Sequence, residues 1–399
     1  MRPLFSVGIW GAEYVRRFLT YSLPSQLAEG NLPAVPDIGK GLYQIVTDHD
    51  DAETIRNSAV YACLRDLMPT EIRDRRDYFS KDANADKYDD LGAIQKTVMA
   101  ESESYDAVFF GYADMIWAQG SLRAAARRIE EGYDAVLSPG LPVAESSFCA
   151  ALDSTARFWR LAGPVKLLSM SSDQLVETML GHLHSLARLN FASQDRISAS
   201  PAYAIWDVPG EGIIMRWFHL HPVALRTRIE GRSLHREFSG SLDEFFVTEL
   251  FGAADRLYLA KDSDEIAFCS IMHDFDAASH HLPFNVASLA QWAENYAALV
   301  HREFFGTGFE FHYRRSDMAL WDKARAASER FHDRLSDRLH LPDSVLALMD
   351  PEQFRGRRER QKRFGMWTRQ ELAGHVIDEK EVGGFWPAPF SQWRLPSRR

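Results

Sequence analysis

The chain has 399 residues, which is enough for a large hydrophobic core and for more than one domain. Hydrophobic residues make up 46% and aromatic residues 12% of it, so a disordered chain is excluded. The net charge of −10 argues against a general nucleic-acid-binding protein, which needs a dominant basic surface.

Two further classes of protein are disfavoured. The cysteines Cys63, Cys149 and Cys269 lie far apart and form no CxxC motif, so we expect buried thiols and no structural zinc site. The first 15 residues lack the apolar region of a signal peptide, and no run of about 18 apolar residues occurs. We therefore predict a cytoplasmic protein without a transmembrane segment.

Predicted strands and helices alternate over the first 140 residues. Residues 4–10 predict a first strand. An amphipathic helix follows over 13–27, and it is expected to break or end near Pro24. Residues 41–47 predict a second strand, and apolar residues at helical spacing follow over 59–67. This alternation is typical of a parallel sheet covered by helices on both faces, a Rossmann-like α/β arrangement.

The clearest pattern lies between residues 105 and 140. Residues 106–110 form a short apolar run that predicts a buried strand, and Asp114 follows just past its end. A helix is predicted from Ser121 to Ile129, and the next strand over 134–138. Since ligands of open α/β sheets bind outside the carboxyl ends of the strands, Asp114 lies where a metal–phosphate site would be built.

This segment resembles the metal-binding region of nucleotide-sugar glycosyltransferases with the GT-A fold, in which a strand ends in Asp-x-Asp. Here Tyr112-Ala113-Asp114 occupies the motif, with Tyr112 in place of the first Asp. The resemblance implies a GT-A-like (Rossmann-like) α/β fold with a mostly parallel sheet flanked by helices. It also implies a divalent cation, Mn²⁺ or Mg²⁺, held by Asp114 beside a nucleotide-sugar donor. The alternative is that Asp114 is a solvated turn residue or a helix cap.

The resemblance further implies that the first two strands hold the nucleotide. The strand ends at Trp10-Gly11 and Thr47-Asp48 share a sheet edge with Asp114 and Tyr112. Gly11 would allow close approach of the backbone, Thr47 could hydrogen-bond a base, and Asp48 or Asp50 could hydrogen-bond a ribose hydroxyl. Neither GxGxxG nor GxxxxGK[ST] occurs, which disfavours dinucleotide and P-loop binding. The alternative for residues 48–51 is an acidic turn that caps the next helix.

A second predicted strand signal covers residues 211–228. On one strand His219 and His221 would share a face, because side chains two residues apart do so. Enzymes of the GT-A fold commonly add a downstream histidine to the metal, so the resemblance makes this pair the complement of Asp114. The alternative is two hydrogen-bonded histidines on a half-exposed strand.

A carboxylate pair, Asp243 and Glu244, follows Gly240 and could supply the general base that deprotonates an acceptor hydroxyl. Alternatively, Ser241 and Glu244 form a capping box, and both roles are compatible. The acidic segment 262–265 is expected to be a solvated loop or a helix cap.

The last part of the chain is predicted to be mainly helical. We expect a GT-A-like catalytic domain over 1–285 and a helical C-terminal subdomain over 286–399. The basic run 355–363 could make peripheral contact with acidic lipid headgroups, although Glu359 interrupts it and a solvated helix face is favoured.

The leading hypothesis is a hexosyltransferase-type glycosyltransferase that moves a sugar from a nucleotide sugar to a hydroxyl acceptor. The acceptor would be a glycan or a lipid-linked molecule, and the reaction would belong to bacterial-type glycan or glycoconjugate synthesis. A sugar-phosphate nucleotidyltransferase is a second reading, but the glycine-rich basic loop that it needs after the first strand is missing. A non-catalytic glycan- or protein-binding member is a third, favoured by Tyr112. The sequence leaves open the sugar, the nucleotide, the acceptor, the stereochemical course and the oligomeric state.

Overall fold

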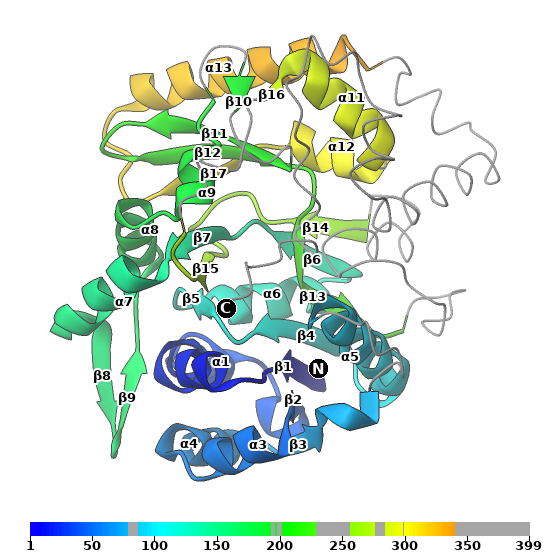
Figure 1. Ribbon diagram of the computed structural model, residues 1–399, viewed down its shortest axis with the longest axis vertical. Coiled ribbons are helices and arrows are strands. Elements are labelled where there is room, and N and C mark those ends of the chain that lie inside the picture. The colour runs from blue at the N-terminus through cyan, green and yellow to red at the C-terminus, as the bar shows by residue number, and fades with distance from the viewer. Residues whose placement is uncertain are drawn as a thin grey trace, which may run out of the picture.

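The computed structural model describes residues 1–78, 87–192, 196–197, 202–228, 256–275, 284–297 and 299–339 (Figure 1). The predicted base residues Asp243 and Glu244 and the basic run 355–363 lie outside these residues.

The centre of the molecule is a seven-stranded sheet with the order β14-β6-β13-β4-β1-β2-β3. All neighbouring strands are parallel except β13, which runs antiparallel to both β4 and β6. The predicted α/β fold with a mostly parallel sheet flanked by helices is therefore confirmed. The strands are β1 (Pro3–Gly8), β2 (Leu42–Thr47), β3 (Thr70–Asp74), β4 (Ala107–Tyr112), β6 (Ala135–Ser138), β13 (His221–Arg226) and β14 (Leu257–Leu259).

Helices cover both faces of this sheet because its strands are apolar on both sides. Phe5 and Val7 of β1 pack into the same core cluster as residues of α1, α4 and α6. Leu4, on the opposite face, packs with residues of α5 and α12. Along one strand the side chains alternate between the two layers, as a strand of period two requires. These helices are α1 (Ala12–Arg17), α4 (Ala59–Leu67), α5 (Lys87–Glu101), α6 (Ser121–Glu130) and α12 (Leu299–Gly306).

The first predicted helix is confirmed with a local irregularity. A π-helical turn over Phe18–Ser22 joins α1 to α2 (Leu23–Gln26), so the helical segment ends one residue before the predicted end. The next helix, α3 (His49–Arg56), follows β2 directly.

A second sheet lies beyond the end of β4 and has the order β5-β15-β7. β15 runs antiparallel to β5 and parallel to β7. The chain then continues through α7, a β-hairpin and two further helices. The elements are β5 (Met115–Trp117), β7 (Leu141–Ala144), β15 (Phe268–Met272), α7 (Glu145–Ser154), β8 (Trp159–Ala162), β9 (Val165–Leu168), α8 (Ser172–Gly181) and α9 (Ser185–Arg188).

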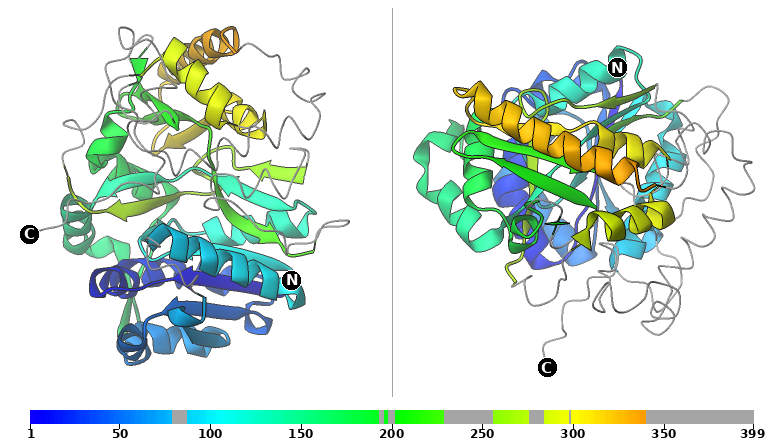
Figure 2. Two further views of the ribbon diagram at one scale, coloured as in Figure 1. Left: turned by 45° about the vertical axis from the view of Figure 1, so that its right-hand side comes forward. Right: turned by 90° about the horizontal axis from the view of Figure 1, so that it is seen from above.

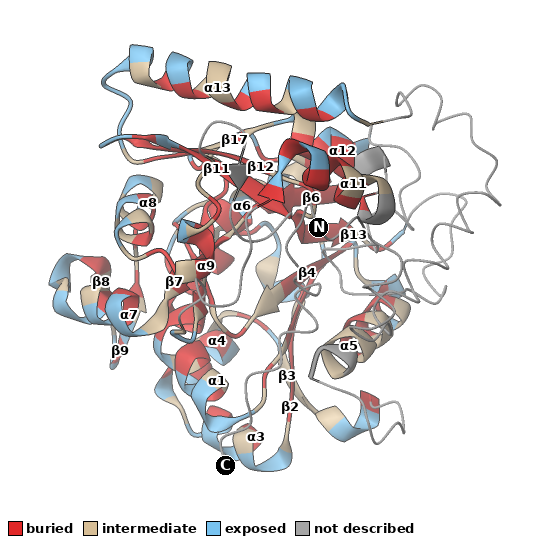
Figure 3. Cartoon of the chain, turned by 45° about the horizontal axis from the view of Figure 1, so that its top comes forward, coloured by how far each residue is buried: buried red, intermediate tan, exposed pale blue. Residues whose placement is uncertain are grey.

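A third, antiparallel sheet has the order β11-β12-β17, and the helices α11 and α13 pack on it. Figure 2 shows α13 lying across β11 and β12, and Figure 3 shows that its inner face is buried. A short ladder of β10 with β16 lies nearby. The elements are β10 (Arg196–Ile197), β11 (Tyr203–Val208), β12 (Gly212–Trp217), β16 (Phe284–Asn285), β17 (Phe309–His312), α11 (Val286–Tyr296) and α13 (Met318–Ser336).

The prediction of one strand over 211–228 is wrong. The segment forms two strands, β12 and β13, which belong to different sheets and are separated by a bend at 218–220. The chain leaves the small antiparallel sheet at Trp217 and enters the central sheet at His221.

The described part of the chain after residue 285 contains helices, as predicted. It also pairs and packs with strands that precede residue 285. β17 pairs with β12, which precedes residue 285, and Phe331 of α13 packs edge-on against Trp206 of β11 at a centroid distance of 5.4 Å. Within the part of the chain that the structure describes, no helix is both long and apolar enough to cross a bilayer. The three cysteines are free thiols, and two of them, Cys149 and Cys269, are buried.

Candidate functional site

Three residues that follow three neighbouring strands meet at the carboxyl edge of the central sheet. Trp10 comes after β1, Asp48 after β2 and Arg75 after β3. The guanidinium of Arg75 lies over the Trp10 ring, 4.6 Å from its centroid, and its Nε donates to Asp48 Oδ1 at 2.9 Å. A second acid, Asp90, lies 3.5 Å from Arg75 Nη1. The edge thus combines an aromatic face, a cation and two carboxylates.

The prediction that Trp10 and Asp48 lie at one edge is confirmed by this cluster, but Arg75 was missed. Its strand, β3, has the polar sequence Thr-Glu-Ile-Arg-Asp and lies at the edge of the sheet, so no apolar run reveals it. Arginine after an edge strand carries no distinctive sequence signal.

The turn after β1 is held by Gly11. Its φ of 88° lies in the left-handed region that glycine adopts without strain, and a Cβ there would meet no atom within 4 Å. Its N–H donates to Asp51 Oδ2 at 2.7 Å, which ties the turn to the first turn of α3. The turn at Gly11 therefore has open space beside its backbone.

Thr47 does not lie as predicted. The side chain is fully buried at the end of β2, and its Oγ1 finds no hydrogen-bond partner among the described residues. The hydroxyl faces the packed interior of the sheet, so it offers no accessible contact to a base. The next residue, Asp48, is partly exposed.

The segment Tyr112-Ala113-Asp114 follows β4 directly. Asp114 is half-buried, and its carbonyl accepts from the N–H of Ile271 at 2.9 Å. The ring of Tyr112 packs against that of His221 at 5.1 Å, and its hydroxyl accepts from Gln95 Nε2 at 3.5 Å. Tyr112 is thus engaged with the protein on the side of β13 and α5.

An ion-pair cluster lies beside Asp114. Glu145, the first residue of α7, accepts from Arg17 Nε at 2.7 Å and from Arg16 Nη2 at 2.9 Å, and lies 3.4 Å from His273 Nδ1. The parallel register of β7 and β15, which pairs Ala144 with Met272, brings the residues after these strands together.

Charge and burial compete at Arg17 and Glu145. Burial alone would lower the pKa of Arg17, but Glu145, Tyr14 and Asp114 together raise it above its ordinary value. Burial likewise works against ionisation of Glu145, yet its bonds to Arg17, His273 and Arg16 bring its pKa below the ordinary value. Both groups are charged at neutral pH, and Asp114 lies near enough to act on Arg17.

Two neighbouring residues complete this cluster. Asp274 accepts hydrogen bonds from the backbone and the hydroxyl of Ser146; burial opposes its ionisation, but these bonds keep its pKa below the ordinary value. His184 is buried, which lowers its pKa, and its Nε2 lies 3.2 Å from the carbonyl of His273. No local sequence pattern indicates that these residues, far apart in the chain, lie together.

The predicted metal ligands Asp114, His219 and His221 do not come together. His219 lies in the bend before β13, where its ring packs against His301 at 4.6 Å and Trp292 at 5.8 Å. His221 begins β13, and its Nε2 lies 3.2 Å from the carbonyl of Phe110. Because only His221 belongs to a strand, the two rings do not share a strand face. Among the described residues, the one group of three close potential ligands is Asp173, Asp264 and His312.

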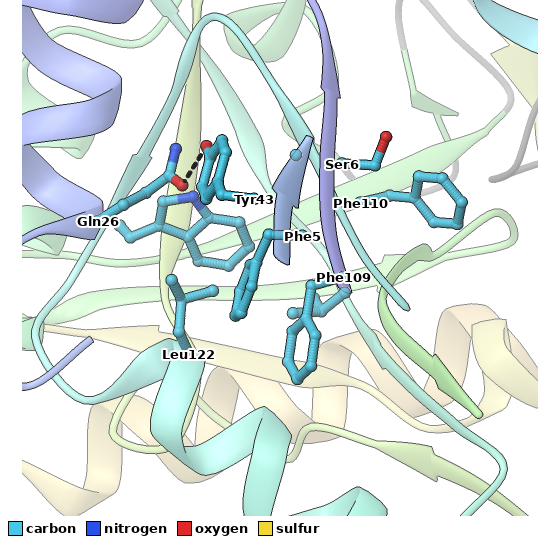
Figure 4. Close-up of a pocket in the computed structure, with 10 residues that line it drawn as sticks. Phe5, Ser6, Gln26, Tyr43, Phe109, Phe110 and Leu122 are labelled. Atoms are coloured by element: carbon cyan, nitrogen blue, oxygen red, sulfur yellow. Dashed lines mark hydrogen bonds between the residues drawn. The ribbon is translucent and has the colours of Figure 1, made fainter. Parts of the chain in front are cut away.

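A small pocket lies inside the molecule between β1, β4 and α6 (Figure 4). Phe5, Phe109 and Leu122 line it, together with Gln26, which accepts from the Tyr43 hydroxyl at 2.8 Å. All five residues are buried, so their side chains belong to the packed core.

Comparison with known proteins gives only remote likenesses. No family model matches the chain, and no curated protein matches it. Among solved structures, TarS from S. aureus is similar at 13% identity with a TM-score of 0.37, over 91% of this chain and 55% of that one. The chain therefore spans about half the length of TarS.

Two further structures are similar over shorter stretches. A Bacillus anthracis protein described as a glucose-1-phosphate thymidylyltransferase, in complex with sucrose, has 13% identity and a TM-score of 0.21, over 37% of this chain and 57% of that one. Mouse xyloside xylosyltransferase 1, in its apo form, has 14% identity and a TM-score of 0.24, over 46% of this chain and 70% of that one. Because every TM-score lies below 0.5, no function of this chain follows from these likenesses.

Proposed function

We propose that this chain is a glycosyltransferase that binds a nucleotide sugar at the carboxyl edge of β1 to β4 and transfers the sugar to a hydroxyl acceptor. One observation carries the proposal: Trp10, Asp48 and Arg75 converge at the ends of three adjacent strands, and Asp114 follows the fourth. Ligands of open α/β sheets bind at such an edge.

The first group is suited to a nucleoside. Trp10 offers an aromatic surface for a base, and Arg75 already fixes its orientation from one side. Asp48 uses Oδ1 to accept from Arg75, so Oδ2 is available to accept from ribose hydroxyls. Gly11, with no side chain, leaves the backbone open between them.

The second group is suited to the diphosphate of the donor. Asp114 is the one acid of the motif, because Tyr112 replaces the first, and among the described residues it belongs to no group of three close potential metal ligands. Mg²⁺ and Mn²⁺ are often held by one or two carboxylates together with substrate phosphates, so Asp114 fits a cation that binds jointly with the donor. Such a cation would neutralise charge on the leaving diphosphate. Arg16 and Arg17, oriented by Glu145, add fixed positive charge nearby.

The acceptor side of the proposal rests on the sequence. Asp243 or Glu244 remains the proposed general base, and a glycan or lipid-linked hydroxyl remains the proposed acceptor. A cytoplasmic location and a hexosyl donor belong to the same proposal.

Thermal stability in the presence of nucleotides tests the proposal. We expect UDP or GDP to raise the Tm of the full-length protein more strongly with Mn²⁺ than without it. Asp114→Asn should abolish the Mn²⁺-dependent part of the rise in Tm. Trp10→Ala should weaken the apparent Kd for nucleotide by about 5- to 160-fold, in line with about 1–3 kcal/mol for stacking of a base. Asp66→Asn, which removes an exposed acid on α4, serves as the control of equal charge.

Two results would redirect the assignment. If no nucleotide shifts the Tm with or without Mn²⁺, the chain is a binding protein and not a transferase. If the protein instead releases pyrophosphate from a nucleoside triphosphate and a sugar phosphate, the nucleotidyltransferase reading holds. Release of nucleoside diphosphate from a panel of nucleotide sugars, lost in Asp114→Asn, supports the proposal directly.

A further inference from the structure

A second group of potential metal ligands lies away from the sheet edge just described. Asp173 is in the first turn of α8, Asp264 lies in the loop between β14 and β15, and His312 ends β17. One ligand atom from each residue lies within 4.8 Å of the other two. Three separate parts of the chain therefore direct metal-binding groups to one point.

The histidine is the fixed member of the group. His312 is only 4% exposed, and its Nε2 has no hydrogen-bond partner among the residues that the structure describes. This nitrogen lies 3.3 Å from Asp264 Oδ2, but not in the geometry of a hydrogen bond. The backbone N–H of His312 donates to Ser263 Oγ at 3.1 Å, which anchors the strand end to the loop that carries Asp264. A buried ring nitrogen that faces two carboxylates without a hydrogen bond is a potential metal ligand.

Among the described residues, the two carboxylates have no lysine or arginine as an ion-pair partner. Neighbouring acids are paired: Asp262 lies 3.4 Å from Arg315, and Glu310 accepts from Arg315 at 3.0 Å and from Arg325 at 2.6 Å. Within the described ranges, neither Asp173 nor Asp264 contacts a lysine or an arginine. Two adjacent carboxylates repel one another, so a cation between them is favoured.

This group is separate from Asp114. The strand β15 begins four residues after Asp264, whereas the carbonyl of Asp114 accepts from Ile271, near the other end of β15. The two places therefore lie toward opposite ends of one strand.

We propose that Asp173, Asp264 and His312 bind a divalent transition-metal ion, best represented by Zn²⁺. Metal–ligand bonds of about 2.1 Å allow ligand atoms up to about 4.2 Å apart, so the exposed carboxylates need to close by less than about 1 Å. One imidazole and two carboxylates suit Zn²⁺ or Mn²⁺ better than Mg²⁺, which prefers oxygen ligands alone. The ion links α8 to the sheet of β17, and so stabilises the fold in proportion to its binding.

Titration of the metal-free, tag-free full-length protein with ZnCl₂ tests this site. By isothermal titration calorimetry we expect one saturable Zn²⁺ site and a Zn²⁺-dependent rise in Tm. The double variant D173N/D264N should bind Zn²⁺ at this site at least about tenfold more weakly and lose the rise in Tm. Both acids are exposed, so the variant is expected to fold, which circular dichroism checks.

Two control variants make the result specific. D322N/D333N removes two exposed acids from α13 and should leave Zn²⁺ binding unchanged. Asp114→Asn should also leave it unchanged, which separates this site from the donor site. Equal Zn²⁺ affinity in the wild type and in D173N/D264N, or no saturable binding at all, overturns the proposal.

Discussion

Glu145 connects α7 to α1 through an ion pair in which Arg17 is almost completely buried. The same carboxylate holds Arg16 and faces His273, so one side chain orients three cationic or polar groups beside Asp114. A carboxylate that is already bonded this often is a positioning group and a poor base.

Replacing Glu145 by Gln should therefore lower both stability and nucleotide binding. We expect a loss of about 2–3 kcal/mol in the free energy of unfolding at pH 7, because Arg17 stays buried without its counter-charge. Since the pKa of Glu145 is lowered by folding, its contribution is full above the ordinary pKa of a glutamate and fades as the pH falls through the lower folded value. Urea unfolding of both proteins between pH 3 and pH 8 should show the difference shrinking in acid.

The control is Glu13→Gln, which removes an exposed partner of Arg16 and should cost well under 1 kcal/mol at any pH. A difference between wild type and Glu145→Gln that stays constant with pH would contradict the role given to the ion pair.

Residue-level prediction from the sequence succeeded where a strand end alone fixes the position. Trp10, Gly11, Asp48 and Asp114 follow strands that the apolar pattern reveals, so their common edge could be foreseen. The prediction that the Thr47 hydroxyl is accessible was wrong, because the direction of a single side chain depends on the packing around it. Arg17 of α1 and Glu145 of α7 are 128 positions apart, and no local pattern encodes their contact.

At the scale of single elements, α13 shows that the spacing of apolar residues is enough to predict a helix. Its buried residues, Trp321, Ala324, Ser328, Phe331 and Leu335, recur every three or four positions, and the predicted helix is present. The helices were therefore predictable, but the strand signal over 211–228 was not resolved into two strands. A run of apolar residues has no feature that marks a change of sheet, and here only the bend at 218–220 separates the two.

Phe331→Ala should test the packing of α13 on the third sheet. The ring is fully buried against Trp206, so its removal leaves a cavity and should cost about 3–5 kcal/mol. Chemical denaturation should show this loss, while Arg330→Ala, an exposed neighbour on the same helix, should stay within about 0.5 kcal/mol of the wild type. A similar small effect for both variants would mean that α13 does not contribute to the cooperative core.

At the scale of the whole molecule, the third sheet joins the two halves that the sequence divided at residue 285. β11 and β12 precede this point, and β17 and α13 follow it. The shift to helical patterning was visible in the sequence, but a single strand that completes a distant sheet was not. Long-range pairing of this kind is specified by packing between segments and leaves no local trace.

A fragment of residues 1–285 should therefore fail to fold as an independent unit. Without β17 and α13, β12 loses its partner strand and buried residues such as Trp206 and Ile214 lose their cover. We expect aggregation in size-exclusion chromatography and strong binding of a hydrophobic dye, unlike the full chain. A monomeric fragment with cooperative thermal unfolding would show instead that the first 285 residues form a domain of their own.

The antiparallel strand β13 also sets an order of events during synthesis on the ribosome. Its place is between β4 and β6, yet it is translated about 80 residues after β6 is complete. At translation rates of about 5–20 residues per second, the nascent chain carries β6 for about 4–16 seconds before that neighbour exists. During this interval the apolar strand Ala135–Ser138 lacks the neighbour that joins it to β4, so its backbone edge toward β13 stays unpaired.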